Sequence, residues 1–391
     1  MPPTEDIGTI DDLRWDSYVK CSGPEFDSFW ENHLSEERDL LFILGRGFDP
    51  RMCEGFEALL EAGGDGKRDS FLVDIDDDAS APSQNHEELA SENEEQLQEL
   101  IDRRGKLTTE SIDMWSGEGH RRRRTGPRNA TQLIRKDDIE SYNDIVVDVS
   151  SLPRSIYVPL TGKLLYLVDD INENQITSEH NSIINLHVIT ASDPILDSMI
   201  NEVGPDEDAH YIPRFSGKME LEAQEEIPKI WIPILGESKY HQLRRIYDHV
   251  SPEEVTPMLP FPAKNPRRGD ALVEEYHTLL FDEWRVQPQN IVYASERNPF
   301  QVYRSIMNTV NLYSKALNPL GGCRTAVSAL SSKLLSIGAL LAAYDSKTKV
   351  NGPDIAIAHI ESQRYSIDGD LSEYDSSTLC SLWLAGECYS A

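Results

Sequence analysis

The sequence predicts an α/β protein made of two Rossmann-like doubly wound halves in tandem, with a polar, partly disordered insertion in the first half. Short apolar runs closed by glycine or polar residues alternate with helical patterns along most of the chain. Continuous apolar runs of this kind are typical of parallel strands, which are buried on both faces. The 391 residues exceed what a single hydrophobic core supports, so two domains are expected.

The first half, residues 1–200, opens with a polar segment whose aromatic residues indicate short helices. Strands are predicted at 39–44, 70–75, 144–149 and 184–190, and helices over 52–60 and 155–168. Residues 76–140 interrupt this alternation because they are rich in Ser, Asn, Gln and Glu and end near the run Arg121-Arg122-Arg123-Arg124. We expect an insertion there, either disordered or a solvated helix over 86–104 with a flexible tip. Three roles are open for its four arginines: contact with phosphate, exposure to solvent, or pairing with the acidic stretch before them.

The second half, residues 227–391, repeats the alternation after an acidic, irregular linker over 200–226. Strands are predicted at 229–235, 255–260, 290–294, 325–329 and 354–360, and helices over 240–247, 271–284, 300–313 and 333–344. Pro257 weighs against the second of these strands because proline cannot donate a ladder hydrogen bond. Strands that alternate with helices in this way favour a doubly wound sheet.

An internal repeat relates the two halves. Gly45 and Gly236 each end the tripeptide Ile-Leu-Gly, which closes an apolar strand before a helix. Further along, the pairs Ser150-Ser151 and Ser331-Ser332 each follow a strand and lead into a helix. The offset from glycine to the second serine is 106 residues in the first half and 96 in the second. We interpret this as a degenerate duplication, with chance similarity between short strand–helix joints as the alternative.

The loops after these strands are the candidate binding site. In an open parallel sheet, the loops at the carboxyl ends of the strands line the ligand crevice, and the helices that follow present free N–H groups to anions. Candidate ligand-binding residues in these loops are Gly45, Arg46, Gly47, Asp49, Arg51, Asp148, Ser150, Ser151, Arg154, Gly236, Lys239, Glu296, Asn298, Ser332 and Lys333. Cations at such positions in a chain of net charge −31 indicate an anionic ligand.

We expect four of these cations to contribute to one crevice between the halves, with Gly45 and Gly236 allowing close approach of the ligand to the backbone. They are Arg46, Arg51, Arg154 and Lys333. The alternatives are ordinary structural roles. Asp49 and the serine pairs also suit helix caps, and Arg154 also suits a surface ion pair.

The charge balance limits the partners. The chain has 68 Asp and Glu against 37 Lys and Arg, which disfavours direct binding of duplex nucleic acid unless a local basic patch overrides it. Such a balance is typical of a salt-adapted proteome, and it also suits a surface that mimics nucleic acid or binds a basic partner. Five scattered cysteines and the lack of a long apolar run predict a cytoplasmic protein with no membrane partner.

Familiar catalytic motifs do not occur in the sequence. It has no P-loop, no His-Glu-x-x-His, no paired Cys and His spacing for zinc and no Gly-x-Ser-x-Gly. The sequence therefore defines no catalytic residue, no cofactor and no metal site, and leaves open whether the protein is an enzyme. His187 and His359 lie in apolar strands and are expected to be core histidines.

One segment resembles a known family. Residues 147–154, Val-Asp-Val-Ser-Ser-Leu-Pro-Arg, resemble the strand and loop of CARF-type Rossmann domains, although Ser-Leu-Pro-Arg replaces the glycine-rich, lysine-containing loop of many such modules. Two such modules in one chain look like a SAVED sensor. The resemblance implies a regulatory protein of prokaryotic antiviral defence that senses a nucleotide-like anion and acts with a defence effector protein. The alternatives are an enzyme acting on a nucleotide or phosphosugar on the same scaffold, and an acidic interaction or scaffold protein.

Overall fold

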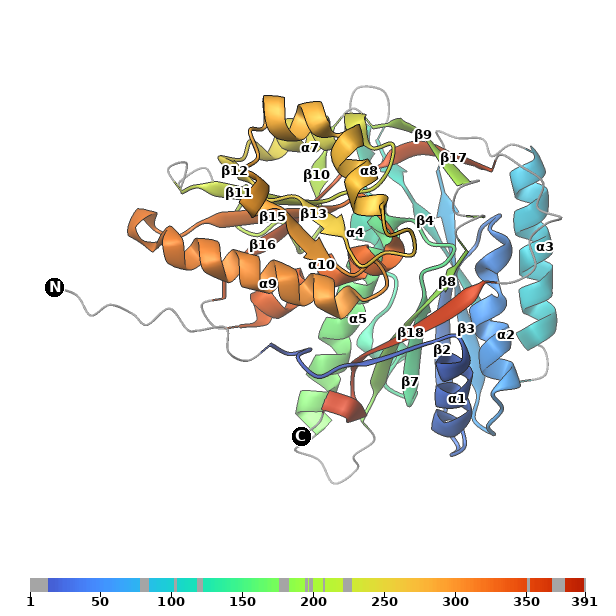
Figure 1. Cartoon of the computed structure of the whole chain (residues 1–391). Coiled ribbons are helices and arrows are strands. Elements are labelled where there is room, and N and C mark those ends of the chain that lie inside the picture. The colour runs from blue at the N-terminus through green and yellow to red at the C-terminus, as the bar shows by residue number, and fades with distance from the viewer. Residues whose placement is uncertain are drawn as a thin grey trace. The chain divides into compact units, whose positions relative to one another are not determined.

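The structure is a computed structural model that describes residues 13–77, 84–101, 104–117, 122–175, 183–193, 196, 200–206, 208–220, 227–349, 352–367 and 377–389. It confirms the predicted fold class. Two mixed, mostly parallel sheets are each flanked by helices, consistent with two Rossmann-like halves (Figure 1). No helix among the described residues combines the length and the apolar character that a bilayer crossing requires.

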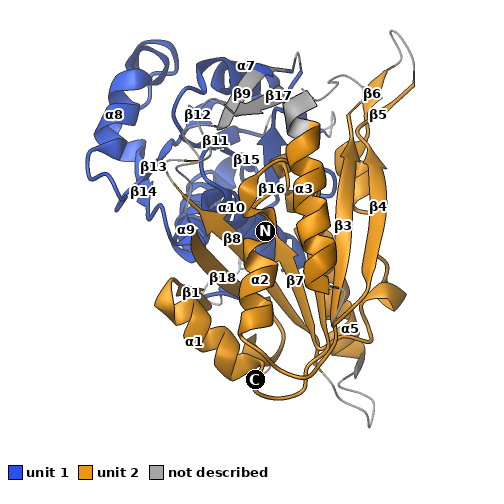
Figure 2. Ribbon diagram, turned by 90° about the vertical axis from the view of Figure 1, so that its right-hand side faces the viewer, with its two compact units in different colours: residues 1–17, 204–362 blue, residues 18–203, 363–391 orange. Residues whose placement is uncertain are grey.

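The chain divides into two compact units (Figure 2). Unit 1 comprises residues 1–17 and 204–362, and unit 2 comprises residues 18–203 and 363–391. The sequence assigned residues 1–200 and 227–391 to the two halves, so the structure differs at both ends of the chain. Two short strands, β9 (Ile200–Pro205) and β17 (Ser362–Ile367), pair with each other where the chain passes between the units.

The sheet of unit 2 has the order β1-β18-β8-β7-β2-β3-β4. Its strands are β1 (Val19–Ser22), β2 (Leu40–Gly45), β3 (Arg68–Asp76), β4 (Leu107–Asp113), β7 (Asp144–Asp148), β8 (Asn185–Ser192) and β18 (Thr378–Ala385). The five strands from β8 to β4 are parallel, β18 runs antiparallel to β8, and β1 runs antiparallel to β18. Every residue of β2 and β7 is buried, as their apolar runs predicted.

Helices cover both faces of this sheet. The helices α1 (Pro24–His33), α2 (Glu54–Glu61) and α3 (Gln84–Ile101) share one core with alternate residues of β2. No residue of α5 (Arg154–Gln175) belongs to that core, and the short α4 (Gly126–Ala130) packs against α5 and β4. We infer that α4 and α5 lie on the opposite face, since the intervening β2 residues are buried as well.

The sheet of unit 1 has the order β10-β16-β15-β11-β13-β14, and β12 also pairs with β11. Its strands are β10 (His210–Tyr211), β11 (Lys229–Ile234), β12 (Glu254–Val255), β13 (Met258–Pro260), β14 (Val292–Ala294), β15 (Arg324–Ala329) and β16 (Ile355–His359). Its helices are α7 (Tyr240–Val250), α8 (Arg268–Glu275), α9 (Pro299–Ala316) and α10 (Lys333–Thr348). The strand predicted at 255–260 is divided into β12 and β13 around Pro257, which has no N–H to donate.

The two sheets share one strand order. Counted along the chain, the parallel strands of each sheet follow the order three-two-one-four-five, as β4-β3-β2-β7-β8 and as β14-β13-β11-β15-β16. An antiparallel strand, β18 or β10, then pairs with the fifth strand. Gly45 and Gly236 come at the end of the first strand of each sheet, and Ser151 and Ser332 follow the fourth. The repeated joints therefore occupy equivalent places, at the switch point where ligands bind in sheets of this type.

The predicted insertion over 76–140 is more ordered than expected where the structure describes it. It contains α3, the edge strand β4, a hairpin of β5 (Trp115–Ser116) and β6 (Arg123–Arg124), and α4. The sequence missed β4 because an edge strand can be polar, and three consecutive residues at its centre are exposed. Arg121 and the part of the linker over 221–226 lie outside the described residues.

Candidate functional site

At the switch point of unit 2 the ends of β2 and β7 lie very close together. The Ser151 hydroxyl donates to the Gly45 carbonyl oxygen at 2.7 Å, and a Cβ at Gly45 would lie 2.5 Å from Cδ2 of Leu152. The Ser150 amide donates to Oδ1 of Asp148 at 2.7 Å, and its hydroxyl accepts from the Ala191 amide at 2.8 Å. The serines therefore tie β2, β7 and β8 together, and only glycine fits at position 45 without a shift of its neighbours.

The cations of the loop after β2 are held by carboxylates. Arg46 donates to Glu87 at 2.6 Å and to Glu94 at 2.8 Å, both on α3. The hydrogen bond to Glu87 outweighs partial burial, and the pKa of Arg46 is raised above its ordinary value. The buried Arg51 donates to both carboxylate oxygens of Asp49, at 2.9 Å and 2.7 Å. A ligand at this loop would have to compete with these internal carboxylates.

Asp49 and Asn93 make further hydrogen bonds that hold the loop after β2 in place. Asp49 also accepts from the Arg51 amide at 3.0 Å, so it caps the turn Pro50–Met52. Asn93 of α3 donates to the carbonyl oxygens of Gly47 and Asp49 at 2.8 Å and 3.0 Å. Arg154 is the first residue of α5 and is half-buried.

Unit 1 repeats the close approach at its own switch point. A Cβ at Gly236 would lie 2.1 Å from the Leu330 carbonyl oxygen, so glycine is required there. The Tyr276 hydroxyl donates to the Gly236 carbonyl oxygen at 2.6 Å and accepts from the Lys239 amide at 2.8 Å. Burial raises the pKa of Tyr276, which keeps this hydroxyl protonated and able to donate.

An arginine that the sequence did not single out lies at the centre of this edge. Arg268 opens α8 and donates to both oxygens of Glu237, at 2.5 Å and 2.7 Å, as well as to Glu296. It also contacts the Ser331 hydroxyl at 3.4 Å. Burial opposes its charge, but the hydrogen bonds to Glu237 prevail and raise the pKa of Arg268. The signal in the sequence was the pair Arg267-Arg268 after β13, a strand that Pro257 obscured.

The remaining predicted residues of unit 1 are at helix starts. Asn298 caps α9, because its Oδ1 accepts from the Phe300 amide at 3.1 Å. Ser332 caps α10 by accepting from the Leu335 amide at 3.5 Å, and Lys333 is the first residue of that helix. Arg46, Arg51 and Arg154 belong to unit 2 and Lys333 to unit 1, so a crevice that all four share stays a prediction.

A second cluster lies at the opposite edge of the unit 2 sheet, where the strands begin. Oδ1 of the fully buried Asp144 faces Nε2 of His33 at 2.8 Å and Nε2 of His187 at 3.3 Å, and it accepts from Asn185 at 3.0 Å. Arg38 lies 3.5 Å from the other carboxylate oxygen. Burial alone would raise the pKa of Asp144, but the two histidines lower it well below its usual range. Burial lowers the pKa of His187, which keeps this ring neutral.

The ligand atoms of His33, Asp144 and His187 lie within 4.8 Å of one another, a set that resembles a metal site. Two observations favour a hydrogen-bonded network instead. The carboxylate already faces several donors, including the cationic Arg38, and the His187 Nδ1 atom is buried without a hydrogen-bond partner among the described residues. A metal-bound histidine needs an acceptor at that second nitrogen.

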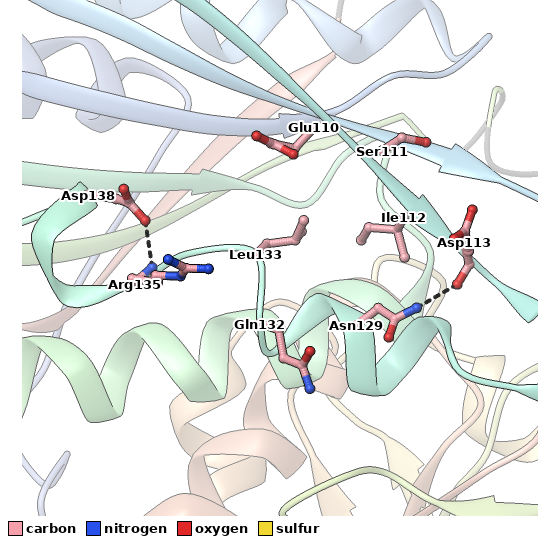
Figure 3. A pocket seen from close by; sticks show the side chains of 9 residues that line it. All are labelled: Glu110, Ser111, Ile112, Asp113, Asn129, Gln132, Leu133, Arg135 and Asp138. Atoms are coloured by element: carbon pink, nitrogen blue, oxygen red, sulfur yellow. Dashed lines mark hydrogen bonds between the residues drawn. The ribbon is translucent and has the colours of Figure 1, made fainter. Parts of the chain in front are cut away.

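A polar pocket of about 460 Å³ lies at the edge strand β4 of unit 2 (Figure 3). Its lining combines β4 with the segment that includes α4: Glu110, Ser111, Ile112, Asp113, Asn129, Gln132, Leu133, Arg135 and Asp138. Asn129 spans this lining, donating to the Asp113 carbonyl oxygen at 2.9 Å. Carboxylates outnumber cations here, so an anion would find little attraction inside the pocket.

The fold and these edges define the chain as an α/β protein with two Rossmann-like sheets. No family model matches it, and no curated protein matches it. Among solved structures it is similar to a universal stress protein from Pseudomonas aeruginosa UCBPP-PA14, at 11% identity over 82% of this chain and 92% of that chain. The TM-score of that match is 0.21, so it carries no information on the function of this chain.

Proposed function

We propose that the chain is a ligand-binding regulatory protein that senses a nucleotide-like anion at the carboxyl edges of its two sheets. The resemblance of residues 147–154 to CARF-type modules extends the proposal to prokaryotic antiviral defence. The observation that carries it is the repeated switch point. In both sheets the glycine after the apolar residues of the first strand lies close to the loop after the fourth, Gly45 beside Ser151 and Gly236 beside Leu330.

The helices that follow these joints supply the anion-binding chemistry. The first N–H groups of a helix have no partner within it, and its dipole places partial positive charge at that end. The helices α5 and α10 are 22 and 16 residues long, and each begins with a cation, Arg154 or Lys333. A phosphate at either helix start would receive backbone hydrogen bonds and a charge-assisted one.

Binding fits these joints better than nucleophilic catalysis. The Ser150 and Ser151 hydroxyls are hydrogen-bonded to backbone groups that hold the strands together. An activated serine would instead need a hydrogen bond to a general base. We therefore favour a sensor over the enzyme alternative.

A thermal-shift screen of nucleotides, with inorganic phosphate and pyrophosphate alongside, tests the proposal. A ligand at 100 times its Kd stabilises the folded state by ~2.7 kcal/mol. Calorimetric titration of the best ligand should then show that Arg154→Ala and Lys333→Ala each weaken binding by ~1.5–3 kcal/mol. Lys315→Ala, at the exposed end of α9, removes the same charge away from the joints and should leave the affinity unchanged.

Recovery of the ligand after incubation separates the sensor from the enzyme. A sensor returns it unchanged, whereas turnover detected by chromatography would favour the alternative. A screen without any stabilising nucleotide, or Arg154→Ala and Lys333→Ala variants that both bind like the parent, would contradict the proposed site.

A further inference from the structure

The chain concentrates positive charge in one short segment of an acidic protein. Residues 121–136 hold six arginines and one lysine and no acidic residue, although the whole chain carries a net charge of −31. The proposed anion site does not use this segment. An isolated basic segment in such a chain calls for an explanation in terms of a partner.

Four of the five described arginines of this segment are exposed: Arg122, Arg123, Arg128 and Arg135. On the hairpin of β5 and β6, Trp115 packs against Arg124 and Arg122, whose guanidinium carbons lie 4.4 Å and 4.6 Å from its ring centroid. The hairpin extends beyond the ends of β3 and β4 (Figure 2). Arg122, Arg123 and Arg128 are exposed and form no ion pair within the part of the chain that the structure describes. We call Arg122, Arg123 and Arg128 the arginine ribbon.

Several other arginines are instead held by carboxylates. Arg38, Arg46, Arg51 and Arg268 each pair with carboxylates of their own unit. Exposed arginines that form no ion pair among the described residues also occur singly elsewhere, at Arg267, Arg285 and Arg297, and the ribbon differs because three of them fall within seven residues. Contact with Trp115 orients Arg122 and so reduces the entropy that its planar guanidinium loses on binding a carboxylate.

The same unit presents a complementary surface on α3. Glu88, Glu92, Glu95 and Glu99 are exposed and recur at the spacing that aligns side chains along one helix face. Like charges at this spacing destabilise a helix unless a cation lies beside them. Glu92, Glu95 and Glu99 form no ion pair among the described residues. We call these three residues the glutamate stripe.

The two surfaces do not pair within one copy. The helix α3 shares its core with α1 and α2, whereas Arg128 lies in α4, which packs against α5. No ion pair within the described ranges joins the ribbon to the stripe. The ribbon is long enough to face the whole stripe, since Glu92 to Glu99 spans about 10 Å of helix and Arg122 to Arg128 at most about 20 Å of chain.

We propose that the glutamate stripe of one copy of this chain docks on the arginine ribbon of a second copy. The contact joins two different surfaces, so one copy keeps its ribbon and the other keeps its stripe for further partners. Such a heterologous contact builds a ring if its rotation closes and an open chain of copies if it does not. It needs no bound ligand and is independent of the proposed anion site.

Because carboxylates lie beside the ribbon, a helix with a short acidic stripe fits it better as a partner than a nucleic acid does. Asp77, which accepts from the Trp115 indole at 2.6 Å, lies on one side, and Asp113 ends the neighbouring strand β4. A nucleic acid strand carries a charge about every 3.4 Å and would continue past the ribbon across these carboxylates. The stripe ends after about two turns of helix and avoids them.

Sedimentation velocity at low and high salt tests the association. The parent protein should form concentration-dependent oligomers at about 50 mM salt and dissociate at about 1 M, where screening shortens the Debye length to ~3 Å. The triple variant Arg122→Glu, Arg123→Glu, Arg128→Glu and the triple variant Glu92→Lys, Glu95→Lys, Glu99→Lys should each be monomeric. An equimolar mixture of the two should associate again, because the reversed surfaces complement each other.

A matched control separates docking from a general change in charge. The variant Glu25→Lys, Asp27→Lys, Glu31→Lys alters net charge as much as the stripe variant but on α1, and it should associate like the parent. Circular dichroism confirms that each variant is folded. A monomeric parent at low salt, or a mixture that stays monomeric, would overturn the proposal.

A separate measurement tests whether the arginine ribbon binds nucleic acid instead of the glutamate stripe. Binding of a labelled single-stranded oligonucleotide is measured by fluorescence anisotropy on the same proteins. If the parent and the stripe variant bind it, and the ribbon variant does not, the ribbon is a nucleic-acid surface and the docking proposal fails. Docking is supported if both triple variants lose the oligomers and the anisotropy of the oligonucleotide does not rise when the parent protein is added.

Discussion

Asp144 should be among the most costly residues of unit 2 to replace. Its carboxylate is fully buried and satisfies Asn185, His33 and His187 at 3.0 Å, 2.8 Å and 3.3 Å. In Asp144→Ala the fully buried Asn185 and His187 lose this acceptor, and each orphaned group costs ~1–3 kcal/mol. Arg38 also loses its buried countercharge, which lies 3.5 Å away. We expect a loss of roughly 3–5 kcal/mol, the range for breaking a buried ion pair.

Urea unfolding followed by amide exchange at β7 and β8 measures this loss within unit 2, because a chain of two units need not unfold in one step. Asp144→Asn keeps one acceptor oxygen and the shape of the side chain, so it should cost less than Asp144→Ala. A loss below ~1 kcal/mol for the alanine variant would refute the reasoning. It would mean that water reaches the donors and that the network is not buried.

The same cluster predicts acid sensitivity. The pKa of His187 is lowered by burial, so the unfolded chain binds a proton there that the folded chain does not. The contribution of His187 is complete above its ordinary pKa of ~6.5 and declines as the pH falls below it, by up to ~1.4 kcal/mol per pH unit. The pKa of Asp144 is also lowered, and its contribution declines only below about pH 4.

Four further outcomes follow from the contacts described. His187→Gln should flatten the decline in stability between pH 7 and 5, which chemical denaturation at each pH measures; an unchanged slope would assign that decline to other groups. Gly236→Ala should lower the stability of unit 1 by ~1–3 kcal/mol because its Cβ would lie 2.1 Å from the Leu330 carbonyl oxygen; unaltered amide exchange in β11 and β15 would show that this joint relaxes freely. Arg268→Ala should cost ~1 kcal/mol, since it removes the cation from the half-buried Glu296 and the exposed Glu237, and the midpoint of thermal unfolding reports it. Zinc should not raise that midpoint in the parent protein, because Arg38 and the other donors already occupy the Asp144 carboxylate; a rise that His187→Gln removes would instead identify a metal site.

The sequence predicted those features that depend on local pattern. Gly45 and Gly236 end buried strands and come directly before helices, so their place at the switch points follows from chain order and the rules of parallel sheets. The caps at Asn298 and Ser332 are local too. Each of these features is determined by residues within a few positions of one another.

Features that depend on distant partners could not be predicted. His33 and Asp144 are separated by 111 residues and Asp144 and His187 by 43, and nothing in one sequence shows that they meet. The carboxylates that hold Arg46 come from α3, a helix within the region expected to be a partly disordered insertion. The strand β18 was missed for the same reason, because its neighbours β1 and β8 lie far earlier in the chain.

The position of β18 sets an order for folding during synthesis. Residues 204–362 emerge from the ribosome before β18 and contain every strand of the unit 1 sheet. The sheet of unit 2 begins much earlier, yet β1 has no neighbour and β8 has one open edge until Thr378–Ala385 arrive. The hydrogen-bonding groups of β1 and of one edge of β8 therefore stay unpaired while unit 1 is synthesised. A chain truncated after residue 362 should therefore have a protease-resistant unit 1 and a protease-sensitive unit 2, and this interval is where a chaperone would be needed.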